Sequence, residues 1–248
     1  MEEIKIKELL KKINSVVCDE LNIHPDQVWF RGHNSTAFKL LPTVLRQKED
    51  FPEIALFYEY KSLVASVNNC NKSNWDLLLD MQHHGLPTRL LDWTSSLGTA
   101  LYFAMQGSPT TPCIWILDPH KLSKTSTGTE LVFDTSTVGD SKDHKGFMVA
   151  ELIKNTSGFE MPYAIRPPHT NRRISAQRGM FTVHTYSRLP IEEQCPEAVR
   201  CIEIPPELII TVKSYLQLLG RVDLCCTFRV QQYIGSHINM NASDNMLA

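Results

Sequence analysis

The chain has 248 residues, with 25 Lys and Arg against 27 Asp and Glu, which gives a formal net charge of −2 at pH 7. Hydrophobic residues make up 42% and charged residues 21%. These values exclude a disordered, collagen-like or low-complexity protein and predict a sizeable core. The near-neutral charge gives no support to a nucleic-acid binder that is held by bulk charge.

The predicted elements mix helices and strands without regular βαβ alternation. This pattern indicates the α+β class, with a mixed or antiparallel sheet flanked by helices. Residues 120–160 are weakly patterned, and we expect loops plus one short helix there. The other expected elements, in chain order, are helices over about 3–18, 49–68, 74–84 and 95–106, strands over 28–32, 113–117, 180–184 and 199–204, and helices over 205–219 and 223–233.

Two of these helices carry end signals. Ser73 and Asp76 approximate a capping box at the start of the helix near 74, and Gly85 stands where a left-handed residue ends it. For the helix near 95, Thr94 or Ser95 is the expected N-cap residue.

The cysteines and the N-terminal sequence indicate the cellular compartment of the protein. Seven cysteines, an odd number without a Cys-x-x-Cys pair, argue against a disulfide framework or a zinc site and favour buried thiols in a reducing compartment. The start MEEIKIKELL has no signal-peptide core, and no apolar run approaches the ~20 residues that span a bilayer. We expect a soluble, cytoplasmic protein with no membrane partner and no bound metal.

The first polar segment that packing does not require is Phe30-Arg31-Gly32. The Arg31 guanidinium can fork onto a phosphate or pair with a structural carboxylate, and the residues leave both readings open. Gly32 allows a ligand or the backbone to approach closely.

The second segment runs from Gln82 to Ser95, with the sequence QHHGLPTRLLDWTS, and leads into a helix N-terminus that favours an anion. The functional interpretation makes it a binding and catalytic segment. The structural interpretation has an Arg89–Asp92 ion pair, a capping Thr94, and His84 at a helix C-terminus. Its functional candidates are His83, His84, Arg89, Asp92, Trp93 (stacking on a ring), Thr94 and Ser95.

The third segment, from Asn171 to Phe181, places three arginines and Gln177 just before a strand. Arg173, Ser175 and Gln177 would share one face of an extended chain. The structural alternative is a solvated basic turn. A basic patch of Arg31, Arg172, Arg173 and Arg178 would instead suit a nucleic acid, which the overall charge does not favour.

Together, these segments resemble the FRG domain family. The resemblance rests on Phe30-Arg31-Gly32, on the run from Gln82 to Thr94 continuing into ALYFA, and on Arg173-Ile174 with Gln177, Gly179 and Phe181. It implies one globular domain over 25–248, preceded by a helical extension over 1–24. It also implies a bacterial protein, with a role as an effector in toxin or phage-defence systems.

The layout is also similar, more distantly, to the Arg-Ser-Glu ADP-ribosyltransferases. That similarity implies an ADP-ribosyltransferase-like architecture with NAD as the ligand. Arg31 would hold the phosphates, Thr94 or Ser95 would order the nicotinamide pocket, and Gln177 would stand at the Glu position. The cavity would be built from Arg31, Gly32, Arg89, Trp93, Thr94, Ser95 and Arg173 as binding residues, with His83, His84, Asp92 and Gln177 in catalytic roles.

Gln177 departs from that pattern because an amide brings no charge to the cation that forms when a ribosyl bond breaks. Asp92 or Glu160 would then supply the carboxylate, and His83 or His84 a base for the acceptor. The sequence therefore predicts a cavity for NAD or another phosphorylated ligand, with transferase or glycohydrolase activity. The alternatives are a non-enzymatic nucleotide- or protein-binding module and a nucleic-acid-processing protein.

Overall fold

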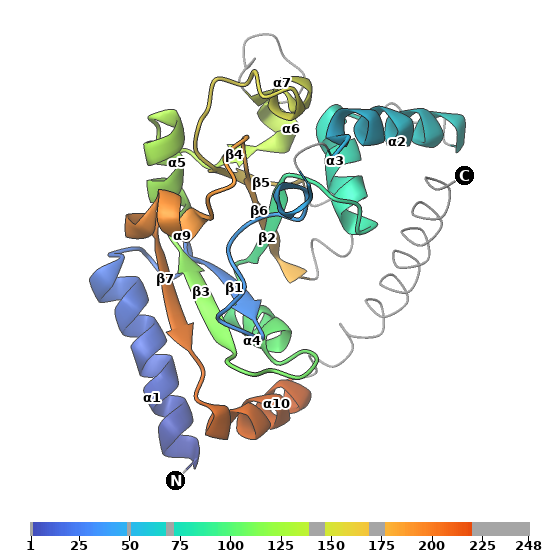
Figure 1. Cartoon of the computed structure of the whole chain (residues 1–248). Coiled ribbons are helices and arrows are strands. Elements are labelled where there is room, and N and C mark those ends of the chain that lie inside the picture. The colour runs from blue at the N-terminus through green and yellow to red at the C-terminus, as the bar shows by residue number, and fades with distance from the viewer. Residues whose placement is uncertain (1, 49–50, 68–71, 139–146, 169–176, 220–248) are drawn as a thin grey trace.

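A single mixed sheet organises the computed structural model (Figure 1), which describes residues 2–48, 51–67, 72–138, 147–168 and 177–219. In the described residues the sheet has seven strands in the order β4-β5-β6-β2-β1-β3-β7, parallel only between β4 and β5. The α+β prediction is confirmed. The strands are β1 Trp29–His33, β2 Leu90–Thr94, β3 Cys113–Leu117, β4 Phe133–Asp134, β5 Tyr163–Arg166, β6 Gly179–Val183 and β7 Val199–Glu203.

Helices cover one face of this sheet in two separate groups. The first group, α1, α4 and α10, packs on β1, β3 and β7 around residues such as Phe30, Ile114 and Ile202. The second group, α2, α3 and α7, packs on β2, β5 and β6 around Leu90, Tyr163 and Phe181. The helices are α1 Glu2–Ser15, α2 Glu53–Val67, α3 Asn74–His83, α4 Leu97–Ala104, α5 Pro119–Thr127, α6 Thr135–Val138, α7 Val149–Ile153, α9 Ile191–Gln194 and α10 Ile209–Leu218.

The opposite face of the sheet carries a third apolar cluster. Trp29, Leu91, Trp93 and Trp115 pack there with Leu122 of α5 and Ile191 of α9. Cys113 is buried in this cluster, as expected for a thiol in the core, whereas Cys201 is exposed. No helix in the described ranges is both long enough and apolar enough to cross a membrane.

The predicted helix ends are partly confirmed. Ser73 and Asp76 form the capping box of α3, and Gly85 takes φ +77° just beyond its end. The predicted N-cap of α4 is wrong, because Ser96 accepts the Thr99 N–H. Thr94 belongs to β2, and Ser95 lies between that strand and Ser96, the residue that directly precedes the helix.

Three strands, β2, β4 and β5, were not predicted. In β2, every residue except Asp92 is buried, and β5 is buried apart from its last residue. Apolar and polar residues therefore do not alternate in these two strands, and the pattern that predicts a strand is absent. Residues 120–160 were expected to be loops plus one short helix, and they hold α5, β4, α6 and α7 instead. The helix expected over 223–233 lies outside the described residues. The proposed domain division at residue 24 stays a prediction, and α1 packs in the same core as β1.

Gly32 explains how α4 lies against the centre of the sheet. A Cβ atom at Gly32 would lie 1.9 Å from the Ala100 carbonyl oxygen and 2.6 Å from the Ala104 nitrogen. Both are backbone atoms of α4, so no side-chain rotation would relieve the clash. The close approach that the sequence predicted at Gly32 is therefore an approach of the backbone.

We predict that Gly32→Ala lowers the free energy of unfolding by about 2–3 kcal/mol, because α4 must move away from β1. The matched control is Gly128→Ala, where the added Cβ meets nothing within 4 Å and only the φ of +78° is unfavourable. That control should cost about 1 kcal/mol. Urea denaturation measures both, and equal losses would contradict the packing role of Gly32.

Candidate functional site

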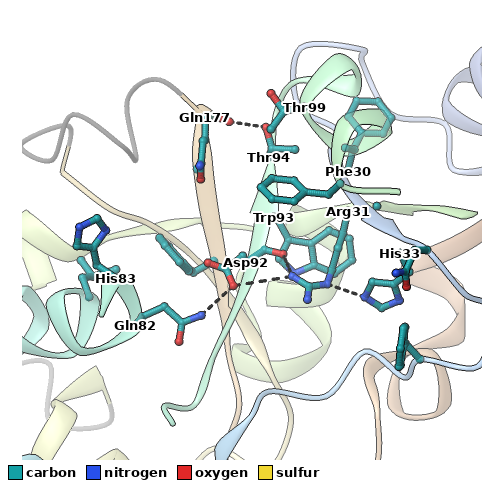
Figure 2. A pocket seen from close by; sticks show the side chains of 18 residues that line it. Phe30, Arg31, His33, Gln82, His83, Asp92, Trp93, Thr94, Thr99 and Gln177 are labelled. Atoms are coloured by element: carbon teal, nitrogen blue, oxygen red, sulfur yellow. Dashed lines mark hydrogen bonds and ion pairs between the residues drawn. The ribbon is translucent and has the colours of Figure 1, made fainter. Parts of the chain in front are cut away.

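The centre of the sheet is opened where β1 meets β2. The β1–β2 ladder has one paired position, Phe30 opposite Thr94, whereas β1–β3 and β2–β6 each have five. Arg31 bridges the opened part. Its Nη1 donates to the Asp92 carbonyl oxygen at 2.5 Å, and its Nε donates to His33 Nε2 at 2.9 Å (Figure 2). A guanidinium thus replaces a backbone hydrogen bond between the strands.

A cavity of about 310 Å³ lies at this opening, between the two helix groups. Its volume is at the lower end of the range for small-molecule sites. Aromatic rings of Phe30, Phe38, Phe103 and Phe181 line it. The polar side chains that line it are Arg31, His33, Asn34, Gln82, His83, Asp92, Thr94, Thr99 and Gln177.

Asp92 is held in this cavity by a chain of hydrogen bonds. The Thr88 hydroxyl donates to Gln82 Oε1, and Gln82 Nε2 donates to Asp92 Oδ2 at 2.8 Å. Arg31 Nη1 lies 3.9 Å from the same carboxylate oxygen, and the Asp92 side chain is 51% exposed. Asp92 is the single carboxylate among the described residues that line the cavity.

Burial and neighbouring charges decide which groups are ionised. Burial lowers the pKa of Arg31, the Asp92 carboxylate opposes this shift, and the Arg46 cation adds to it. Burial, together with the charge of Arg31, lowers the pKa of His33 to about 3. His33 is therefore neutral at pH 7, which is the form whose Nε2 accepts from Arg31.

Gln177 is fixed to β2 through its backbone. The Thr94 hydroxyl donates to the Gln177 carbonyl oxygen at 2.6 Å and accepts from the Ser96 N–H at 3.0 Å. The next residue, Arg178, takes a left-handed φ of 48°. The Gln177 side chain faces the cavity (Figure 2).

The structure brings His83 to the cavity and leaves His84 outside it. His83 is a lining residue, whereas His84 Nε2 lies 3.8 Å from Asp80 Oδ1 on the same helix. Their divergence follows from the turn of about 100° per residue in a helix. Trp93 lines the cavity but is 3% exposed, and its indole N–H donates to the Thr182 hydroxyl within the core of the opposite face.

Arg89 lies away from the cavity, and the expected Arg89–Asp92 pair is wrong. Arg89 Nε and Nη2 bind the Glu53 carboxylate at 2.7–2.8 Å, while Nη1 donates to the Thr185 carbonyl at 2.6 Å. The Arg89 side chain is 5% exposed. Asp92 instead pairs with Gln82 and Arg31. Successive side chains of an extended chain point to opposite faces, so residues 89 and 92, three positions apart, meet different partners.

The remaining predicted residues fall into two groups. Arg172 and Arg173 lie outside the described residues, and Glu160 and Arg178 are exposed and do not line the cavity. The basic patch expected for a nucleic acid therefore stays a prediction, because two of its four arginines lie outside the described residues. Within the described ranges, no group of His, Cys, Asp and Glu could hold a metal ion.

Sequence reasoning did not single out His33, Phe38 or Arg46. His33 follows Arg31 by two residues on a strand, and this spacing places both on one face, which was the available signal. Arg46 and Phe38 come from the irregular segment between β1 and α2, where no periodicity predicts direction.

Fold and site together define an α+β domain with a polar cavity at an opened sheet centre. The family model described as FRG domain matches residues 26–111, which include Arg31, Gln82, His83 and Asp92. This match over residues 26–111 agrees with the predicted resemblance to the FRG domain family. The comparison with curated proteins and that with solved structures give no match.

We predict that Arg89→Met lowers the free energy of unfolding by about 3–5 kcal/mol, because it strands the buried Glu53 carboxylate without a cation. The control is Arg200→Met, which removes an ion pair with the half-exposed Glu20 and should cost no more than about 1 kcal/mol. Urea denaturation of both variants checks this, and equal losses would show that Arg89 is not a structural residue.

We also predict a pH dependence that is centred on His33. The pKa of His33 in the folded state is about 3, below the ordinary 6.5. The stability that neutral His33 gives to the fold is therefore complete above pH 6.5 and is lost as the pH falls toward 3. His33→Gln keeps an oxygen to accept from Arg31 and cannot titrate. Its free energy of unfolding should fall less steeply than that of the wild type between pH 7 and pH 4.

The slope that remains in the His33→Gln variant is expected from His184, whose pKa burial also lowers to about 3. His24→Gln is the control, because the His24 side chain is 70% exposed. If the free energy of unfolding falls equally with pH in the wild type and in His33→Gln, His33 is not the group responsible for this pH dependence.

Proposed function

We propose that the cavity binds a phosphorylated nucleotide-type ligand, for which NAD is the leading choice, and cleaves or transfers at its ribosyl bond. The observation that carries this proposal is the placement of one cation and one carboxylate, Arg31 and Asp92, side by side in a cavity with aromatic walls. The Arg31 cation would bind a phosphate, and the Asp92 carboxylate would serve ribosyl transfer.

Arg31 has donors to spare for a phosphate. A guanidinium carries five N–H groups, and His33 and Asp92 accept two of them, which leaves three. The side chain is 23% exposed. Because both contacts fix the guanidinium in place, a phosphate would bind a donor set that is already oriented.

Asp92 would stabilise the positive charge that develops on the ribose as the base leaves. Gln177 cannot do this because its amide is neutral. Gln82 orients the carboxylate, and His83 lines the same cavity, where an imidazole can accept a proton from water or from a macromolecular acceptor. The outcome would be glycohydrolase activity with water and ADP-ribosyl transfer with another acceptor.

Only part of an NAD molecule would fit inside the cavity. A volume of about 310 Å³ suits one nucleoside-sized portion of a ligand, and the rest of a dinucleotide would lie along the opening. Arg46 does not line the cavity, but its charge acts on both Arg31 and His33, and it would attract the remaining phosphate. A role as an effector in bacterial toxin or defence systems stays a prediction from the family resemblance.

The second candidate is a nucleotide-binding module without catalysis. It is favoured by the contacts of Arg31 with the Asp92 carbonyl and with His33, which brace the two strands whether or not a ligand binds. The two candidates differ in what Asp92 does, because only the enzyme requires its charge.

We predict that NAD raises the melting temperature of the wild-type protein. At about ten times Kd the gain is about 1.4 kcal/mol, or about 3–6 °C. Arg31→Met should abolish the shift relative to its own ligand-free melting temperature, and Arg200→Met, which lies on edge strand β7, should retain it. No wild-type shift at millimolar NAD would remove the NAD proposal.

The same titration separates the enzyme from the binding module. Asp92→Asn should keep the NAD-induced shift and lose the release of nicotinamide, measured by chromatography. Release of nicotinamide at the wild-type rate from Asp92→Asn would show that Asp92 does not stabilise the cation.

A further inference from the structure

The cavity wall contains a buried hydrogen-bond donor that the fold does not use. Gln177 Nε2 is out of contact with solvent and finds no hydrogen-bond partner among the described residues. A buried polar group without a partner destabilises a fold, so such groups are rare. This one lies on the wall of the cavity rather than inside the apolar core.

The position of this donor is set by the fold. The Gln177 carbonyl accepts from the Thr94 hydroxyl at 2.6 Å, and the neighbouring Arg178 carbonyl accepts from the Ser95 N–H at 3.2 Å. Two contacts to the end of β2 therefore hold the backbone on which the side chain stands. The backbone that carries the amide is therefore held at the wall of the cavity.

The cavity that Gln177 lines has aromatic walls. Phe30, Phe103 and Phe181 line the same cavity, while Asp92 and Gln82 bind each other on the side of α3 (Figure 2). Aromatic walls suit a flat ring, since offset or edge contacts between rings are favourable. A hydrogen-bond donor on the wall of such a cavity favours rings that carry an acceptor.

We propose that Gln177 Nε2 binds a carbonyl-type oxygen on a heteroaromatic ring of the ligand, so that the cavity interior holds the base and Arg31 holds the phosphate. This inference rests on the proposed function and deepens it, because it assigns the base-recognition role to the residue that cannot act as the charged catalyst. The nicotinamide group of NAD, with its carboxamide, has the required chemistry.

The test compares Gln177→Leu with the wild type, using nicotinamide mononucleotide and ribose 5-phosphate as probes in calorimetric titrations. These probes differ by the ring and its carboxamide. Gln177→Leu should bind nicotinamide mononucleotide about five- to tenfold more weakly, the effect of one lost hydrogen bond. Its affinity for ribose 5-phosphate should be unchanged. Gln194→Leu, which alters an amide outside the cavity, is the control.

A second measurement needs no ligand. Because Gln177→Leu removes an unpaired buried donor, the ligand-free melting temperature should rise by about 2–4 °C. A fall would show that the amide serves the fold, and it would overturn this inference while leaving the proposed function intact. Equal weakening for both probes, or no weakening, would do the same. If the wild type binds neither probe nor NAD, the proposed function itself fails.

Discussion

The separation of β1 from β2 is the constraint on which the rest of the structure depends. Two central strands that share one ladder position would normally lose their register, because the missing hydrogen bonds leave backbone groups without partners. Arg31 compensates by donating to the Asp92 carbonyl across the opening. On one side, α4 presses against Gly32, and on the other, β6 pairs along all of β2. The cavity is the space that these contacts keep open.

This arrangement explains why so many neighbours of the cavity are fixed before any ligand arrives. Arg31 is bound at two of its nitrogens, Asp92 by Gln82, and Gln177 by Thr94 through its backbone. Side chains that are already ordered lose little entropy when a ligand binds. His33 contributes by staying neutral, because a protonated imidazole could not accept from Arg31 and would repel it.

The sequence predicted the features that depend on neighbours along the chain. The capping box at Ser73 and the left-handed Gly85 involve residues within a few positions of each other, so local patterns reveal them. It did not predict the partner of Arg89, because Glu53 lies 36 positions earlier and no pattern relates the two. Strand β2 was missed for a similar reason, since burial on both faces removes the alternation that marks a strand.

The motif from Gln82 to Thr94 therefore serves the fold and the site with different residues. A comparison of Arg89 in this motif with Arg31 in the cavity illustrates the division. Arg89, 5% exposed, uses its donors on Glu53 and a carbonyl, whereas three of the five Arg31 donors, on a side chain that is 23% exposed, have no acceptor among the described residues. Along β2, Leu91 and Trp93 enter the core of one face while Asp92 and Thr94 face the cavity. A substitution in this motif thus reports on chemistry only where the residue has no part in the core, and Asp92 meets that condition best because half of its side chain is exposed.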